Sequence, residues 1–216
     1  VSEIAEVMLV GHATTNDDYC FALQGNKCRK MHTSRRDTFR PINCKPFAKI
    51  WADGKIKNVR NDFNKRNKNK VNVDAVFDEN VGILKAYPGN NSKVIDFFRK
   101  NCKGIVIEGT GLGHVAADGK YNLVPDLKKA IEKGLLAYMT SQAFYGRVDS
   151  NVYDYGRKVA DAGVVFLEDM LPETAYIKLG WVLGHKQWRG SVATKRKMLE
   201  NVSGEFNDRL GNDFLN

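Results

Sequence analysis

The chain has few cysteines, and they lie in no recognisable pattern. Its 216 residues contain four: Cys20, Cys28, Cys44 and Cys102. None forms a CxxC pair, and no histidine lies near them at metal-ligand spacing, which argues against a disulfide framework and a zinc site. We therefore expect a cytoplasmic protein without a metal centre.

Long apolar runs are also missing. Residues 7–10 and 134–139 are among the longest, far short of the roughly 20 residues that a membrane-spanning helix needs. No signal-peptide pattern precedes them. The sequence therefore predicts no contact with a membrane, and it contains no internal repeat.

What the chain has in excess is positive charge. There are 34 lysines and arginines against 25 acidic residues, a net charge of +9. Such an excess attracts polyanions, although solubility alone accounts for it more simply. Many of these charges interleave with asparagines in residues 55–70, where Phe63 is the one aromatic side chain. We interpret this stretch as a solvated linker, with nucleic-acid contact as the weaker alternative.

The beginning of the chain predicts a strand with little before it. Residues 5–11 are apolar enough to suggest a strand buried on both faces, which needs neighbouring strands on both sides. Only a few residues precede it, and the first is not methionine. We therefore expect the chain to be a fragment that lacks an amino-terminal part.

Residues 1–60 contain further strand patterns. We expect strands at 19–23, 47–51 and 55–59, and a short arginine-rich segment after the first of these. The Asp53-Gly54 pair between the last two strands is a strong hairpin signal.

A regular alternation of strands and helices follows the linker. Expected strands at 81–86, 104–108, 135–140 and 164–166 precede expected helices at 92–101, 123–133, 152–162 and 173–183. This order predicts a parallel sheet covered on both faces, with right-handed crossovers. Gly134 and Gly163 suit the left-handed position after a helix, and Pro172 suits a first helical turn. A basic helix-like piece at 192–201 comes last.

Residues 109–114 form a glycine-rich loop directly after an expected strand. Their spacing is not GxGxxG, and no Gly-Lys-Ser/Thr follows, so a nucleotide-binding loop is poorly supported. A tight turn that needs positive φ explains the glycines better.

Three segments carry a family resemblance: 29–37 (RKMHTSRRD), 104–111 (GIVIEGTG) and 168–175 (EDMLPETA). They resemble the asparaginase/glutaminase family, in particular its archaeal glutamyl-tRNA(Gln) amidotransferase D subunits. The resemblance implies an asparaginase-like α/β fold. Residues 1–60 would be the tail of an N-terminal α/β domain and 61–80 a basic linker. A smaller flavodoxin-like parallel α/β domain would span 81–187, and a tail 188–216.

The resemblance also implies roles for individual residues. Lys30 matches the family's catalytic lysine, which together with a Thr-Asp pair transfers protons to and from a hydroxyl nucleophile. His114 stands where the family carries an asparagine that holds the substrate. Ser141 and Gln142 match a family Thr-Ser-Gln element, for which hydrogen bonding at the sheet edge is the simpler explanation.

One family feature is missing from the chain. The family's threonine nucleophile lies in a Thr-Gly-Gly-Thr element and its second pair in a His-Gly-Thr-Asp-Thr element. Neither occurs in these 216 residues. We therefore expect the chain alone not to hydrolyse glutamine.

The function implied by the resemblance belongs to protein biosynthesis. A glutaminase subunit would release ammonia from glutamine so that Glu-tRNA(Gln) becomes Gln-tRNA(Gln). It would form a homodimer, bind no cofactor itself, and reach tRNA(Gln) through the E subunit of the amidotransferase, which uses ATP and Mg. A free-standing L-asparaginase and a non-catalytic RNA-binding or interaction module are the alternatives.

Overall fold

The computed structural model describes residues 2–211, which fold into two compact units. Among the described residues, the first unit consists of 2–73 together with 209–211. The second spans Asp74–Asp208. The boundary between Val73 and Asp74 falls inside the region 61–80 that the sequence suggests as a linker.

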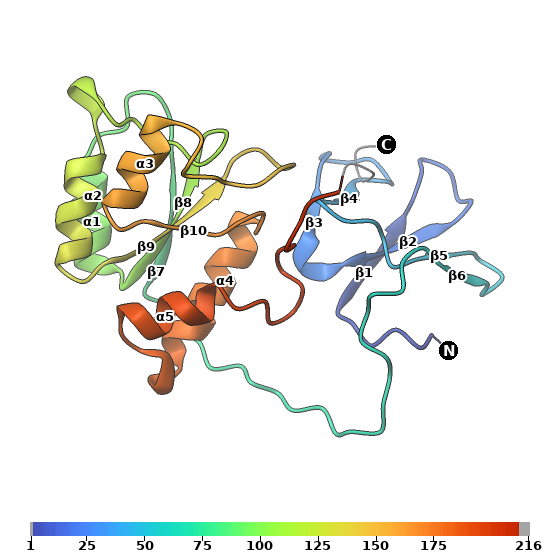
Figure 1. Ribbon diagram of the computed structural model, residues 1–216. Coiled ribbons are helices and arrows are strands. Elements are labelled where there is room, and N and C mark those ends of the chain that lie inside the picture. The colour runs from blue at the N-terminus through green and yellow to red at the C-terminus, as the bar shows by residue number, and fades with distance from the viewer. Residues whose placement is uncertain (1, 212–216) are drawn as a thin grey trace. The chain divides into compact units, whose positions relative to one another are not determined.

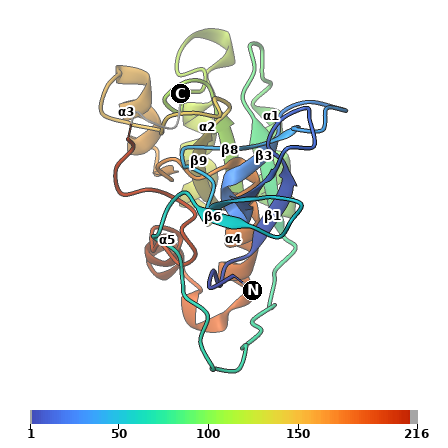
Figure 2. The same cartoon turned by 90° about the vertical axis from the view of Figure 1, so that its right-hand side faces the viewer.

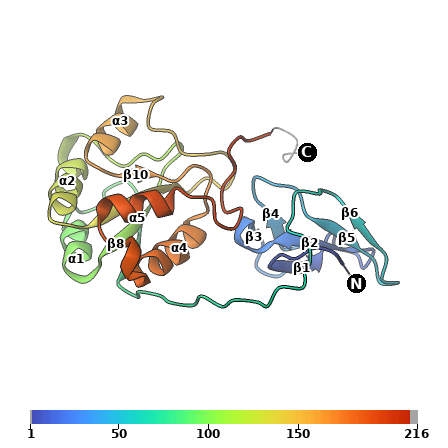
Figure 3. The same ribbon diagram turned by 60° about the horizontal axis from the view of Figure 1, so that its bottom comes forward.

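The first unit is built on an antiparallel sheet with the strand order β1-β2-β5-β6. Its strands are β1 (Met8–His12), β2 (Cys20–Gln24), β5 (Ala48–Ile50) and β6 (Ile56–Asn58), which Figure 3 shows together. A small core of Ile4, Ala22, Phe47 and Ala48 lies against it. The expected hairpin at Asp53-Gly54 is confirmed, because β5 and β6 pair antiparallel and Gly54 has a φ of +87°.

The prediction that the first strand is buried on both faces is wrong. β1 is an edge strand of this sheet, and β2 is its one partner strand in the described chain. Val7 is 86% exposed and Val10 is 55% exposed. A short apolar run does not by itself distinguish a fully buried strand from an edge strand with one covered face.

A second, two-stranded sheet occupies the arginine-rich segment, where the sequence suggested no strand. The 3-10 helix η1 (Gly25–Lys27) leads into β3 (Cys28–Lys30), which pairs antiparallel with β4 (Phe39–Pro41). Figure 2 labels β3 in this part of the chain. The segment 29–37 therefore includes part of one strand and most of the loop that follows it.

The second unit contains the expected parallel sheet, with the order β10-β9-β8-β7. The strands are β7 (Val81–Lys85), β8 (Gly104–Gly109), β9 (Leu136–Ser141) and β10 (Val165–Phe166). The helices are α1 (Lys93–Asn101), α2 (Val124–Glu132), α3 (Asp154–Asp161), α4 (Pro172–Gly184) and α5 (Ser191–Met198). Two 3-10 turns, η2 (Gly119–Tyr121) and η3 (Lys186–Trp188), lie between them.

Helices cover both faces of this sheet, as expected (Figure 1). Successive side chains of a strand point to opposite faces. Ile105 and Ile107 of β8 belong to a core with residues of α1, α2 and α3. Val106, between them, belongs to a second core with residues of α4 and α5. The signals at the helix ends are confirmed too, since Gly134 and Gly163 have φ near +99° and +98°, and Pro172 opens α4.

The residues just before β7 pack onto α4. The Phe77 ring packs directly against Gly180 and fills the space that a side chain at this position would occupy. A Cβ on Gly180 would come within 2.1 Å of the ring. The Asp78 amide donates to the Gly180 carbonyl at 2.9 Å, and Lys103 Nζ contacts the Asp78 carboxylate at 2.5 Å. The chain is therefore fixed to the second unit from about Asp74 onward.

None of the helices in residues 2–211 combines the length and the apolar character that crossing a membrane would require.

Candidate functional site

The candidate site in the second unit lies at the carboxyl ends of its parallel strands. Ligands of open parallel α/β sheets bind in the crevice beyond these ends. Because the four strands run in the same direction, the loops that follow them meet at one edge. The loop after β8 and the loop after β9 carry most of the polar groups described below.

The glycine-rich loop after β8 is a tight turn, as the sequence suggested. Thr110 and His114 exchange backbone hydrogen bonds of 2.9 Å, and Gly111 and Gly113 have φ of +51° and +99°. A Cβ on Gly109 would lie 2.7 Å from Met139 Sδ. The glycines are therefore needed for backbone conformation and close packing.

His114 leaves this turn with one ring nitrogen unpartnered. Its ring meets the Tyr153 ring edge-on at 5.6 Å between centroids. Nε2 is buried and has no hydrogen-bond partner within residues 2–211. Leaving a buried polar atom unpaired costs about 1–3 kcal/mol, so such an atom requires an explanation. A ligand that supplies the missing partner would provide one, and the substrate-binding role of His114 stays a prediction.

Gln142 and Ser141 fasten the loops to one another. Gln142 Nε2 donates to the Ala86 carbonyl at 2.5 Å and to the Glu108 carbonyl at 2.8 Å. Ser141 Oγ donates to the Gly111 carbonyl at 2.6 Å and accepts from the Ala143 amide at 3.0 Å. These bonds join the ends of β7, β8 and β9. The structure thus gives both side chains the hydrogen-bonding role at the sheet edge.

An arginine–glutamate pair that the sequence did not reveal links the loops after β9 and β10. Arg147 donates to the Glu168 carboxylate and, at 3.2 Å, to the Asp208 carbonyl. Glu168 is one of two non-glycine residues with positive φ in the described chain, at +57°, and its carbonyl accepts from the Val148 amide at 2.9 Å. No local sequence signal marks such a backbone, because only the fold determines it. Arg147 and Glu168 also line a small hollow beside the start of α4.

Asp169, the residue after Glu168, binds the chain near its carboxyl end. Asp169 accepts hydrogen bonds from the Asn207 backbone amide and from Asn207 Nδ2, both at 2.7 Å. It is buried. The positive N-terminal end of α4 favours a carboxylate placed before it, and the bonds to Asn207 give Asp169 a structural role as well.

Lys30 belongs to the first unit, where the structure places it on β3 opposite Phe39 of β4. Its side chain is exposed. The structure thus provides an accessible amine on a paired strand. Its proton-transfer role stays a prediction.

A buried carboxylate organises the loop after Lys30. Asp37 is 4% exposed and receives two 2.9 Å hydrogen bonds from Arg35 and a further one from Arg40. Burial raises the pKa of the Asp37 carboxyl, but the hydrogen bond and charge of the two arginines outweigh burial and hold its pKa below the ordinary value. Arg35 and Arg40, two members of the basic run in the sequence, thus stabilise the loop by binding a buried carboxylate. The spacing of Asp37 between two arginines was the available signal.

No group of three or more potential ligand side chains is arranged to hold a metal ion in the part of the chain that the structure describes. The four cysteines are free thiols.

Comparison with known proteins identifies similar sequences. The family model of the glutaminase/asparaginase C-terminal domain matches residues 80–196. The D subunit of glutamyl-tRNA(Gln) amidotransferase from Thermococcus kodakarensis is 54% identical over 207 residues, which are 95% of this chain and 46% of that protein. The protein of the same name from Methanobrevibacter smithii is 46% identical over 209 residues, 96% of this chain and 47% of that protein. The chain thus spans about half the length of these relatives.

Solved structures give a consistent result for the fold. The thermostable L-asparaginase from Thermococcus kodakarensis superposes with a TM-score of 0.79 at 28% identity, covering 88% of this chain and 56% of that one. L-asparaginase I from Vibrio cholerae gives a TM-score of 0.74 at 25% identity, covering 87% and 55% of the two chains. The asparaginase-like α/β fold class expected from the sequence is confirmed.

Proposed function

Because this chain belongs to the glutaminase/asparaginase family, we propose that it is part of the glutaminase subunit of a tRNA-dependent amidotransferase. That subunit would release ammonia from glutamine, and the ammonia would convert Glu-tRNA(Gln) to Gln-tRNA(Gln). The observation that carries the proposal is the 54% identity, over 95% of the chain, to a protein named as the D subunit of glutamyl-tRNA(Gln) amidotransferase.

Two residues of this chain have roles in the proposal. Lys30, accessible on β3, would move protons to and from a threonine hydroxyl that another part of the protein contributes. His114 would use its unpartnered Nε2 to hold glutamine. The nucleophile elements are absent from these residues, so we expect no hydrolysis by this chain alone.

The remaining parts of the proposal concern the surroundings of the enzyme. A partner protein, the E subunit of the amidotransferase, would use ATP and Mg and hold most of the tRNA. The glutaminase subunit itself would form a homodimer and bind no cofactor directly. The four free thiols suit a cytoplasmic location.

A free-standing L-asparaginase is the second candidate, because the solved structures with similar folds carry that name. Sequence identity distinguishes the two candidate functions. It is 28% to the Thermococcus kodakarensis asparaginase and 54% to the amidotransferase subunit from the same organism. The amidotransferase function is therefore the better supported one.

The proposal can be tested with a chimaera in which this chain replaces the matched 46% of the D subunit from Thermococcus kodakarensis. Ammonia release from glutamine and from asparagine is measured with and without the E subunit. We expect release from glutamine, and none from the isolated chain. A chimaera that acts on asparagine alone would favour the asparaginase, and one that is folded yet inactive on both amides would contradict the proposal.

The same chimaera tests Lys30. We expect Lys30→Ala to lower the kcat for glutamine about 100-fold or more, since a positioned proton-transfer group contributes about that much. Lys68→Ala, which removes another exposed lysine, is the matched control and should leave kcat unchanged. Near-normal turnover by Lys30→Ala would show that this lysine is not catalytic.

A further inference from the structure

The positive charge of the chain is concentrated in its first third. Residues 1–73 carry 15 lysines and arginines against 7 aspartates and glutamates, whereas residues 74–208 carry 18 against 17. The net charge of +9 therefore comes almost entirely from the first unit. A surface that attracts polyanions should be found there.

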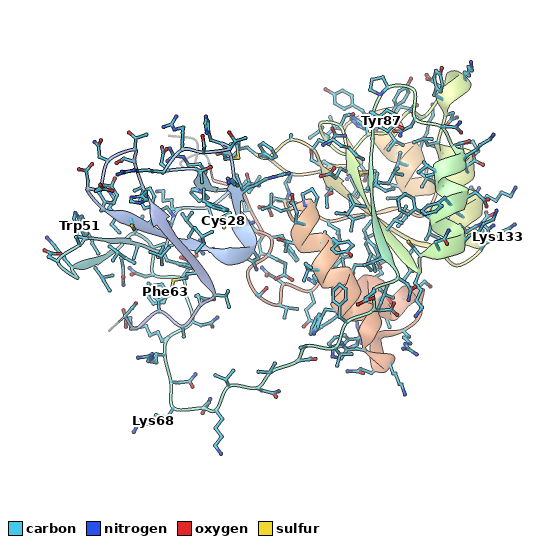
Figure 4. The ribbon with its side chains drawn as sticks, turned by 180° about the vertical axis from the view of Figure 1, so that it is seen from behind. Cys28, Trp51, Phe63, Lys68, Tyr87 and Lys133 are labelled. Carbon is cyan, nitrogen blue, oxygen red and sulfur yellow. The ribbon has the colours of Figure 1, made fainter. Side chains whose placement is uncertain are left out.

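Aromatic rings accompany this charge on one face of the antiparallel sheet. Phe21 of β2 pairs with Lys49 of β5, which pairs with Lys57 of β6, and residues paired in this way project on the same face. The Tyr19 ring lies 5.5 Å from the Phe21 ring and 5.7 Å from the Trp51 ring. Figure 4 shows Trp51 in this unit.

Lysine ammonium groups lie over these rings. Lys49 Nζ is 4.7 Å from the centre of the Tyr19 ring, and Lys55 Nζ is 5.5 Å from that of Trp51. The three rings are half-buried, while Lys55 and Lys57 are exposed. We call the set of Tyr19, Phe21, Lys49, Trp51, Lys55 and Lys57 the aromatic–lysine face.

One carboxylate beside this face is hydrogen-bonded to the backbone. Asp53, in the turn between β5 and β6, accepts a hydrogen bond from the Lys55 backbone amide at 2.9 Å. None of the three lysines makes an ion pair with an acidic side chain within residues 2–211. Their charge is therefore available to a ligand.

We propose that the aromatic–lysine face binds single-stranded nucleic acid. Unpaired bases stack on aromatic rings, and lysines beside the rings contact the phosphates between successive bases. Flexible lysine side chains can swing from a ring face toward a phosphate as a base arrives. An acidic peptide would use the charge alone and would leave the accessible parts of the half-buried rings without a role. The function proposed above assigns most RNA recognition to a partner, so this inference goes beyond it and does not depend on amide hydrolysis.

The test uses the 216-residue chain and a fluorescein-labelled oligouridine of about 12 nucleotides, a length within the usual range for such sites. Fluorescence anisotropy gives Kd between about 50 and 200 mM salt. We expect the combined variant K49E/K55E/K57E to weaken binding at least about 10-fold and to make the salt dependence shallower by about two in log–log slope, as the loss of three phosphate contacts predicts.

A matched control carries the same charge change elsewhere. The variant K128E/K129E/K133E alters three exposed lysines at α2 and the residue that ends it, in the second unit. We expect it to weaken binding less than about 3-fold. If both variants weaken binding equally, the interaction follows net charge and the proposal is wrong.

Stacking is tested separately through Trp51. Oligouridine should quench tryptophan fluorescence, and Trp51→Leu should abolish the quenching and weaken binding about 5-fold or more. Unfractionated heparin, which has charge but no bases, should bind Trp51→Leu as well as the original chain. Unchanged oligouridine binding by Trp51→Leu, or absence of quenching in the original chain, would overturn the proposal even if the lysine variant failed to fold.

Discussion

At the scale of single residues, the loop after β8 shows how two glycines in one turn differ in what they require. Both Gly111 and Gly113 have positive φ. Around Gly111 an added Cβ would meet nothing within 4 Å, whereas on Gly113 it would lie 2.8 Å from Met139 Cγ and from the Phe166 ring. Conformation alone restricts the first position, and conformation and packing together restrict the second.

We therefore expect Gly113→Ala to destabilise the protein clearly more than Gly111→Ala. The backbone cost of about 1–2 kcal/mol is common to both, and forcing a methyl group into a packed core adds about 1–3 kcal/mol at Gly113. Urea denaturation followed by circular dichroism measures both. Equal losses of stability would show that the core around Met139 adapts freely to the extra methyl.

Residue-level predictions from the sequence succeeded where a local rule decides the conformation. The turn glycines, Pro172 and the Asp53-Gly54 hairpin follow from backbone sterics, and all are confirmed. The positive φ of Glu168 and the unpartnered Nε2 of His114 could not be predicted. Both depend on how groups that are distant in sequence come together in the fold.

At the scale of elements, α4 shows a conflict between helix propensity and packing. Gly180 lies inside the helix, where alanine is normally better by about 1 kcal/mol. Its missing side chain makes room for Phe77, and Gly184 similarly approaches the Phe77 backbone, at 2.9 Å from a Cβ to the nitrogen. The two glycines thus lower the helix propensity of α4 but allow the segment before β7 to pack closely against it.

The substitution Gly180→Ala tests this view, because the two effects have opposite signs. Propensity alone predicts a gain in stability, but a Cβ 2.1 Å from the Phe77 ring would displace the ring. We expect a net loss of about 1–3 kcal/mol. Ile177→Ala, on an exposed position of the same helix, is the control and should change the melting temperature little. A higher melting temperature for Gly180→Ala would contradict the packing argument.

The same segment should respond to acid through Asp78. Burial raises the pKa of this carboxyl, but hydrogen bonds from Lys103 and Asn80 outweigh it and lower the pKa to about 2. A depressed carboxyl pKa stabilises the fold above the unfolded-state value near 3.8, and this contribution is lost as the pH falls toward about 2. Asp78→Asn should therefore be less stable than the original chain at about pH 6 and similar to it at about pH 2.

Urea midpoints across this pH range measure the difference, with Asp161→Asn at an exposed position of α3 as the control. A stability gap between Asp78→Asn and the original chain that persists unchanged to the lowest pH would mean that the carboxylate charge is not its source.

Prediction of whole elements from sequence was better in the second unit than in the first. Each of the four strand–helix repeats was found, because strands buried on both faces and amphipathic helices have distinct patterns. In the first unit, β3 and β4 are three residues each and rich in arginine. Asp37, in the loop between them, accepts hydrogen bonds from Arg35 and Arg40, and the spacing of these three residues was the one local signal.

At the scale of the whole molecule, the chain consists of two compact units with an irregular stretch between their sheets. Residues 66–80 contain no helix or strand, and residues 74–80 within them are fixed to α4. This leaves Arg66, Lys68 and Lys70 exposed on chain that lacks protective secondary structure.

Trypsin should therefore cut first between residues 66 and 70, because proteases act on exposed irregular chain. Lys128 and Lys129 are also exposed but lie in α2, so they serve as an internal control and should be cut much later. Mass spectrometry of early digestion products identifies the order. An early cut in α2 would mean that the helix opens more readily than the irregular stretch.

The unequal division of charge has a kinetic consequence. A polyanion diffusing nearby feels attraction chiefly from residues 1–73, since the charges of residues 74–208 nearly cancel. Productive collisions are then favoured before any contact forms, and the association rate constant rises above that of a neutral surface. This attraction extends over about one Debye length, roughly 10 Å at 0.1 M salt, and its range becomes shorter as salt is added. Lowering the salt concentration should thus raise the association rate of a polyanion with residues 1–73 and hardly change its association rate with residues 74–208.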